Sequence, residues 1–181
     1  MKKRLLALLL AVLVVSSFLT IGAAAVTTDE VVAKLDNIMT QSEFKPGYTG
    51  GRWGQDDCWV FANAVSQQLF NEGIPNGPSG YLLTNIANHP NWSHVGTKTA
   101  SNDSVLEFLK QAQPGDVLQF KSTAATWQHT SMVYNVTNST ISIYEFRNPT
   151  RGVVLAVERV AVGIGVMDGD DKGEVYLVLK S

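Results

Sequence analysis

Hydrophobic residues near the start of the chain recur every three or four positions, which is the spacing of one helix face. Val31, Leu35 and Ile38 follow this spacing, and the four residues before them, 27–30, read Thr-Thr-Asp-Glu. A Thr followed three residues later by Glu is a capping box, which marks the start of a helix. The pattern predicts a helix that begins at this box and ends before the Gly-rich turn at 45–51.

A second helical pattern lies between Asp57 and Gly73. Phe61, Val65 and Leu69 form its apolar face. Asp57 is suited to cap the first backbone N–H groups, and Gly73 is suited to end a helix because glycine adopts left-handed backbone angles at little cost. The sequence therefore predicts a helix that begins at residue 58 and is closed by Gly73.

The period of the pattern changes after Pro114. Before it lies a polar, turn-rich connection with short helices predicted at 81–87 and 104–112. After it, β-branched and apolar residues alternate as in strands, over residues 116–120, 130–136, 140–146, 152–162 and 174–179. Helices followed by antiparallel strands predict an α+β domain, with the N-terminal helices packed on a C-terminal antiparallel β-sheet.

The first 25 residues have the pattern of a signal peptide. Basic residues at 2–4 precede an unbroken apolar run at 5–15, and the alanines at 23–25 offer a cleavage site. We expect cleavage there, which leaves one domain, residues 26–181, that is secreted or held in the cell envelope. An uncleaved membrane anchor is the alternative, although we expect no stable anchor.

Charge and composition argue against several kinds of partner. Removal of the leader takes away three positive charges and no negative ones, so the net charge goes from −2 to −5. Such a surface repels the phosphates of nucleic acid, and the sequence shows no basic patch. The acidic segment 168–174 superficially resembles a calcium loop, but Lys172 stands at a ligand position. We therefore expect no nucleic acid, metal or other cofactor, and we favour a monomer.

Cys58 is the only cysteine in the chain. Exported proteins usually keep their cysteines in disulfide pairs, because the environment outside the cell is oxidising. The predicted helix start adds a second property, since the unpaired N–H groups and the dipole there stabilise a thiolate. We interpret Cys58 as a candidate nucleophile, with a buried structural thiol as the alternative.

A thiolate nucleophile needs a base that takes its proton and a third group that orients the base. Of the three histidines, His89 and His94 lie in the polar connection, where we expect surface loop residues. His129 instead opens a predicted strand. It is therefore the candidate base.

Glu145 is the candidate third group, and its relation to His129 depends on the hairpin between them. A connection of three residues near Asn138 places both side chains on the same face, directly or diagonally opposite, whereas a two-residue loop places them on opposite faces. Glu145 also stands where the pattern calls for an apolar residue, which is costly unless the acid is paired. The alternative is that it lies just past the buried zone, or pairs with Arg147 or Arg151.

The same residues carry a resemblance to a known family. Cys58 opens a helix, Pro-Gly-Asp-Val at 114–117 opens a strand, His129 opens the next strand, and Glu145 lies on the one after. This order, from about residue 51 to 148, resembles the CHAP family (cysteine, histidine-dependent amidohydrolase/peptidase) and its NlpC-like relatives in the papain-like superfamily. The resemblance implies a papain-like fold with Cys58 as nucleophile, His129 as general base and Glu145 as third member.

The resemblance also implies a reaction, which is hydrolysis of amide or peptide bonds through a thioester, with bacterial peptidoglycan or a peptide as substrate. Gln55 is the expected oxyanion donor beside the Cys58 backbone N–H, and Asn148 is a further candidate there. Trp53 and Trp127 flank the site in sequence and are expected to line the substrate groove, with ordinary packing as the alternative for both.

Two departures from the family pattern keep other functions open. Asp57 stands before the cysteine where CHAP domains often have Gln, and Arg147 stands two residues after the acid where they often have Asn. One competing function is a secreted, non-catalytic binding or effector domain on the same fold. Another is a transamidase or acyltransferase that uses the same nucleophile.

Overall fold

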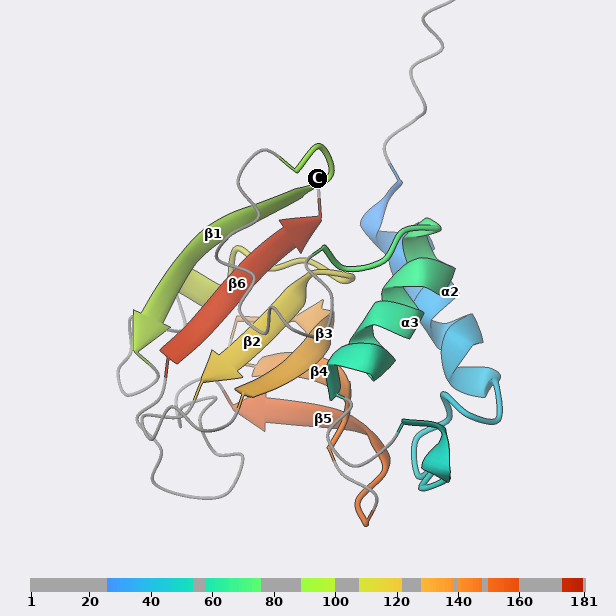
Figure 1. The fold of residues 1–181 in the computed structure, drawn as a ribbon. Helices are drawn as coiled ribbons and strands as arrows, with labels where there is room; N and C mark the ends of the chain where they lie inside the picture. Colours follow the sequence, from blue (N-terminus) through green and yellow to red (C-terminus); the bar gives the residue numbers. More distant parts are fainter. Residues whose placement is uncertain are drawn as a thin grey trace, which may run out of the picture.

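The computed structural model describes residues 26–53, 58–75, 89–99, 108–121, 128–138, 140–147, 150–159 and 174–180. Within them, α2 (Thr28–Thr40) and α3 (Cys58–Phe70) lie side by side and pack on one face of an antiparallel sheet (Figure 1). The short 3-10 helix η1 (Gly51–Trp53) lies between them in sequence. The domain is therefore α+β. No helix in these ranges is both long and apolar enough to cross a membrane. The predicted signal peptide lies outside them.

The described part of the sheet has six strands in the order β1-β6-β2-β3-β4-β5. Their bounds are β1 (Trp92–Thr99), β2 (Val117–Lys121), β3 (Gln128–Val136), β4 (Thr140–Phe146), β5 (Val153–Arg159) and β6 (Glu174–Lys180). The five strands predicted after Pro114 are all present. β2 to β5 follow one another across the sheet, and β6 returns to pair with β2 on one side and β1 on the other (Figure 1).

β1 is a strand that the sequence pattern did not predict. The segment was expected to be part of a turn-rich connection, with His94 in a surface loop, and this expectation was wrong. β1 reads Trp-Ser-His-Val-Gly-Thr-Lys-Thr, and its register with β6 shifts between His94 and Gly96. It is an edge strand of polar composition with a bulge, so it lacks the regular alternation that marks a half-buried strand.

A capping box begins α2, whereas a residue with left-handed backbone angles ends α3. Thr27 and Glu30 form the predicted capping box, in which the Thr27 hydroxyl accepts from the Glu30 backbone N–H and the Glu30 carboxylate accepts from the Thr27 N–H. α3 ends at Phe70, before the predicted Gly73, because Asn71 already takes a left-handed φ of 56°. Asn tolerates this conformation better than most side chains. The predicted cap Asp57 lies outside the described residues.

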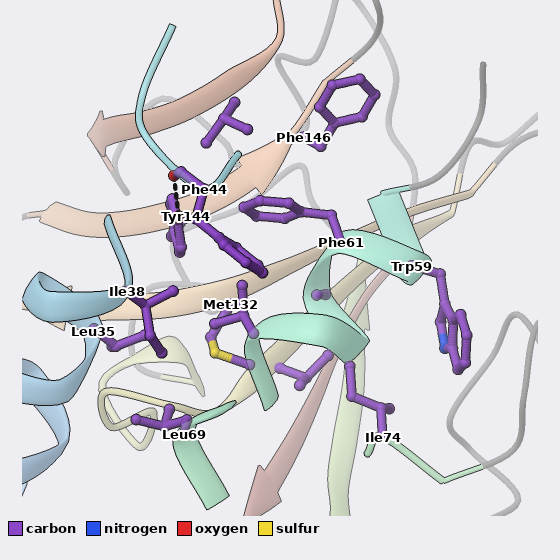
Figure 2. Close-up of a cluster of buried hydrophobic side chains, with 14 of the residues drawn as sticks. Leu35, Ile38, Phe44, Trp59, Phe61, Leu69, Ile74, Met132, Tyr144 and Phe146 are labelled. Carbon is purple, nitrogen blue, oxygen red and sulfur yellow. Dashed lines mark hydrogen bonds between the residues drawn. The ribbon is translucent and has the colours of Figure 1, made fainter. Parts of the chain in front are cut away.

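An aromatic cluster fixes α3 against the sheet. The ring of Phe61 on α3 lies 4.9 Å from Tyr144 on β4 and 5.2 Å from Trp53, both edge to face. The buried Tyr144 hydroxyl donates to the backbone carbonyl of Phe44 (Figure 2). Because α3 is held at Phe61, its first residue, Cys58, is held one turn away.

The central strands are covered on both faces. Val117 and Met132 belong to the cluster under the helices, whereas their neighbours Leu118 and Val133 belong to a second cluster, as strand alternation requires. The second cluster includes Phe108 and Leu109, the described helical residues of the helix predicted at 104–112, together with Ile141 and Ile143. Side chains at the end of β4 are therefore buried whichever way they point.

Candidate active site

Cys58 is the first residue of α3, and its side chain is partly exposed. The thiol interacts with the His129 side chain and receives backbone hydrogen bonds from Thr130 and Trp59. Burial acts to raise the thiol pKa, but the hydrogen bond and charge of His129 and these backbone contacts outweigh it, so the pKa of Cys58 lies below its usual value. These contacts therefore favour the thiolate form of Cys58.

His129 lies on β3 and is only 5% exposed. Its Nε2 lies 2.7 Å from Oε2 of Glu145. Since Nε2 faces the carboxylate, the hydrogen bond with Cys58 uses the other ring nitrogen, Nδ1. Burial favours the neutral ring, but the hydrogen bonds and charges of Cys58 and Glu145 prevail and raise the pKa of His129 to about 9.

Glu145 is fully buried on β4, and each of its oxygens has a partner. Oε2 contacts His129, and Oε1 accepts from Nε of Arg147 at 2.5 Å. Burial acts to raise the pKa of this carboxyl, but the two cationic partners lower it below its usual value. The carboxylate, the imidazole and the thiol thus form a connected chain across β4, β3 and α3.

The prediction that His129 and Glu145 share a face is confirmed, but its premise about the loop was wrong. Val136 pairs with Ile141, so four residues, an even number, connect the partners. Tyr134 has no partner in the register, because Val133 pairs with Ile143 and Asn135 with Ser142. This bulge shifts the register by one residue and returns His129 to the face of Glu145.

The structure excludes one predicted groove residue. Trp53 is 1% exposed, packs on Phe61, and its indole N–H donates to the Glu43 carbonyl at 2.9 Å. Its role is packing, because a side chain this deeply buried presents no surface to a substrate. Three other predicted site residues, Gln55, Trp127 and Asn148, lie outside the described residues.

The other histidines lie away from this centre. His89 stands 3.8 Å from Glu72, beyond the C-terminal end of α3, whereas Cys58 is at the N-terminal end. His94 lies on β1, which β6 and β2 separate from β3. In the described ranges, no three His, Cys, Asp or Glu side chains gather in a way that would hold a metal ion.

Two further groups contribute to this centre, the backbone of Thr130 and the side chain of Arg147. The backbone of Thr130 bonds to the thiol, which no sequence pattern reveals. Arg147 was considered as the partner of Glu145 only if Glu145 had no role at His129, yet the carboxylate contacts both. A carboxylate with two oxygens accepts from two cations at once, so the two interpretations of Glu145 were not exclusive.

Among known proteins, we found similarity to a solved structure but to no family model and no curated protein. Among solved structures, the X-ray crystal structure of PlyC is similar with a TM-score of 0.40 and 13% sequence identity. The match covers 86% of this chain and 41% of the PlyC chain, so this chain spans less than half the length of that one.

Proposed function

We propose that this chain is a cysteine hydrolase that cleaves amide or peptide bonds through a thioester intermediate. The observation that carries the proposal is the 2.7 Å contact between His129 Nε2 and Glu145 Oε2, which leaves the other nitrogen of the ring for Cys58. Nucleophile, base and orienting acid in mutual hydrogen-bond reach are the geometric signature of this chemistry.

The reaction has two halves. The Cys58 thiolate attacks the substrate carbonyl carbon, and the negative charge that develops on the carbonyl oxygen is stabilised by N–H donors at the start of α3. His129 gives its Nδ1 proton to the leaving amine as the C–N bond breaks, which forms the thioester. His129, now neutral, takes a proton from water, whose oxygen attacks the thioester and releases the acid.

The substrate and location in this proposal come from the sequence. The resemblance to CHAP and NlpC-like enzymes favours bacterial peptidoglycan, and the leader at 1–25 favours a protein secreted or held in the cell envelope. The fully buried Glu145 adds support from the structure, because a buried carboxylate is costly and is kept where its charge is used.

The test is release of new amines from a peptidoglycan suspension by the purified protein. Cys58→Ala and His129→Ala are each expected to abolish release, because the two residues act as one unit. Cys58→Ala is expected to leave the melting temperature nearly unchanged, whereas His129→Ala is expected to lower it, because the buried Glu145 loses a partner. His94→Ala is the matched control, since it removes a histidine on the distant strand β1 and is expected to keep full activity.

Other outcomes decide between functions. Full activity of Cys58→Ala would show that the mechanism is wrong. Binding of the wall preparation without cleavage, equal in the parent and in Cys58→Ala, would establish the non-catalytic domain. Products in which an added amine replaces water, identified by mass spectrometry, would establish a transamidase.

A further inference from the structure

Arg147 contacts the carboxylate behind the histidine. It follows the last residue of β4 and lies two positions after Glu145, so both side chains leave the chain on the same side. Its Nε lies 2.5 Å from Oε1 of Glu145, and its side chain is 18% exposed. Its backbone N–H donates to the Gly152 carbonyl at 3.1 Å, which fixes the point from which the side chain extends.

We propose that Arg147 is a positioning residue of the catalytic centre, which holds Glu145 in the one orientation that anchors His129. This inference rests on the proposed function. With Oε1 bound by the guanidinium, the carboxylate cannot rotate without breaking a charge-assisted hydrogen bond, so Oε2 stays directed at His129 Nε2. The ring is in turn held with its other nitrogen toward Cys58.

The chemistry of arginine suits this role. A guanidinium stays protonated at every pH at which proteins fold, so Arg147 supplies a constant charge and no proton. Without it, Oε1 of a fully buried carboxylate would lose its cationic partner, which favours protonation of the acid. A protonated Glu145 would no longer stabilise the imidazolium that His129 becomes.

The charges that act here come from three packed elements. In the described part of the chain they are Cys58 on α3, His129 on β3, Glu145 on β4, and Arg147 directly after β4. Arg147 is a cation, so its removal raises the pKa of the Glu145 carboxyl and weakens the ion pair that lowers the pKa of the Cys58 thiol. The lower limb of a pH profile, set by Cys58, is therefore expected to move to higher pH.

The experiment measures alkylation of Cys58 by iodoacetamide across pH, together with amine release from peptidoglycan, on protein expressed from the full chain. Arg147→Gln is expected to raise the midpoint of alkylation by about one pH unit and to lower turnover at neutral pH by about tenfold or more. Arg151→Gln, an exposed arginine in the following turn, is the matched control and is expected to follow the parent.

Arg147→Lys separates charge from geometry. Lysine keeps the cation but not the fixed fork of donors, so we expect an alkylation midpoint near that of the parent with lower turnover. If Arg147→Gln does not fold, the lysine variant still decides. A lysine variant that equals the parent in turnover at every pH would overturn the need for a positioned guanidinium.

The failure of this inference differs from the failure of the proposed function. If the parent has a low alkylation midpoint and Arg147→Gln has the same one, Arg147 has no positioning role and the cysteine hydrolase stands. If the parent itself alkylates like an ordinary thiol, with a midpoint at about pH 8.5, the proposed function and this inference are both wrong.

Discussion

His129 contacts Glu145 from a diagonal position on the neighbouring strand. Met132 pairs with Tyr144, so one further step places Glu145 opposite residue 131, two positions from His129. Diagonal neighbours in a sheet lie about 7–8 Å apart at the backbone, a span that an imidazole and a carboxylate together bridge. The 2.7 Å contact between them therefore uses ordinary strand geometry.

That geometry depends on the bulge at Tyr134. A regular continuation of the pairing between Val136 and Ile141 would send His129 and Glu145 to opposite faces of the sheet. Bulges near active sites often direct a side chain in this way. The unpaired residue is thus part of how the centre is built.

The first prediction concerns the pH range of activity. As pH falls through the depressed pKa of Cys58, the sulfur takes up a proton and the nucleophile is lost. As pH rises through about 9, His129 loses the proton that the leaving amine needs. We expect a bell-shaped plot of kcat/KM against pH with its upper limb near pH 9. An upper limb near 6.5, the ordinary value for histidine, would contradict the ion-paired site.

The second prediction concerns Glu145→Gln. The amide keeps the shape of the side chain but carries no charge, and its NH₂ group faces one of the two donors, His129 or Arg147. We expect turnover to fall by about 10³-fold to 10⁴-fold but not to zero, because an orienting group supplies no bond-making atom.

The same variant is expected to move the upper limb of the pH profile below 9. Glu145 raises the pKa of His129 through its hydrogen bond and its charge, so its neutralisation lowers that pKa. Glu43→Gln, which removes a carboxylate that pairs with Arg52 near the surface, is the control. An unchanged upper limb in Glu145→Gln would mean that the carboxylate does not act on the imidazole.

These residues show what the sequence could and could not predict. Cys58 and His129 were identified because their types are rare in this chain and stand at element starts. Glu145 was identified because it interrupts an apolar face. Each is a local signal, and local signals also located the two helices and five of the strands.

What the sequence could not give depends on tertiary structure. The bulge at Tyr134 leaves no mark in the alternation of residues, and the polar edge strand β1 forms only because β6 returns beside it. Trp53 illustrates the same limit, since a tryptophan near a nucleophile in sequence fits a groove or a core equally well until its neighbours are known.

The third prediction separates two tyrosines that both donate hydrogen bonds. Tyr144→Phe leaves the carbonyl of Phe44 without its buried partner, and an unsatisfied buried acceptor costs about 1–3 kcal/mol of unfolding free energy. Tyr134→Phe removes a bond to Asp36 at a more exposed position, where water replaces it, so we expect a change within about 0.5 kcal/mol. Urea denaturation measures both, and equal losses would contradict the burial argument.

The last prediction concerns two glycines in segments that contact each other, Gly47 in the turn after α2 and Gly152 in the turn directly before β5. Gly47 and Gly152 both have positive φ, 90° and 68°, which other residues adopt only with strain. The two positions differ in the space around them. A Cβ on Gly152 would lie 2.2 Å from the carbonyl oxygen of Tyr48, whereas a Cβ on Gly47 would meet nothing within 4 Å.

We expect Gly47→Ala to lower the free energy of unfolding by about 1–2 kcal/mol, from the strain alone. We expect Gly152→Ala to lower it by about 2–5 kcal/mol, because a clash with backbone adds to the strain and no rotamer relieves it.

The Gly152 carbonyl also accepts from the Arg147 N–H. A shift of the backbone at Gly152 is therefore expected to reach Glu145 through Arg147. We expect Gly152→Ala to lower the turnover of the folded fraction, and Gly47→Ala to leave it unchanged. Urea denaturation and amine release at a temperature where both variants are folded test this. Equal loss of stability in the two variants would contradict the clash at Tyr48, and equal amine release would contradict the link from Gly152 to Glu145.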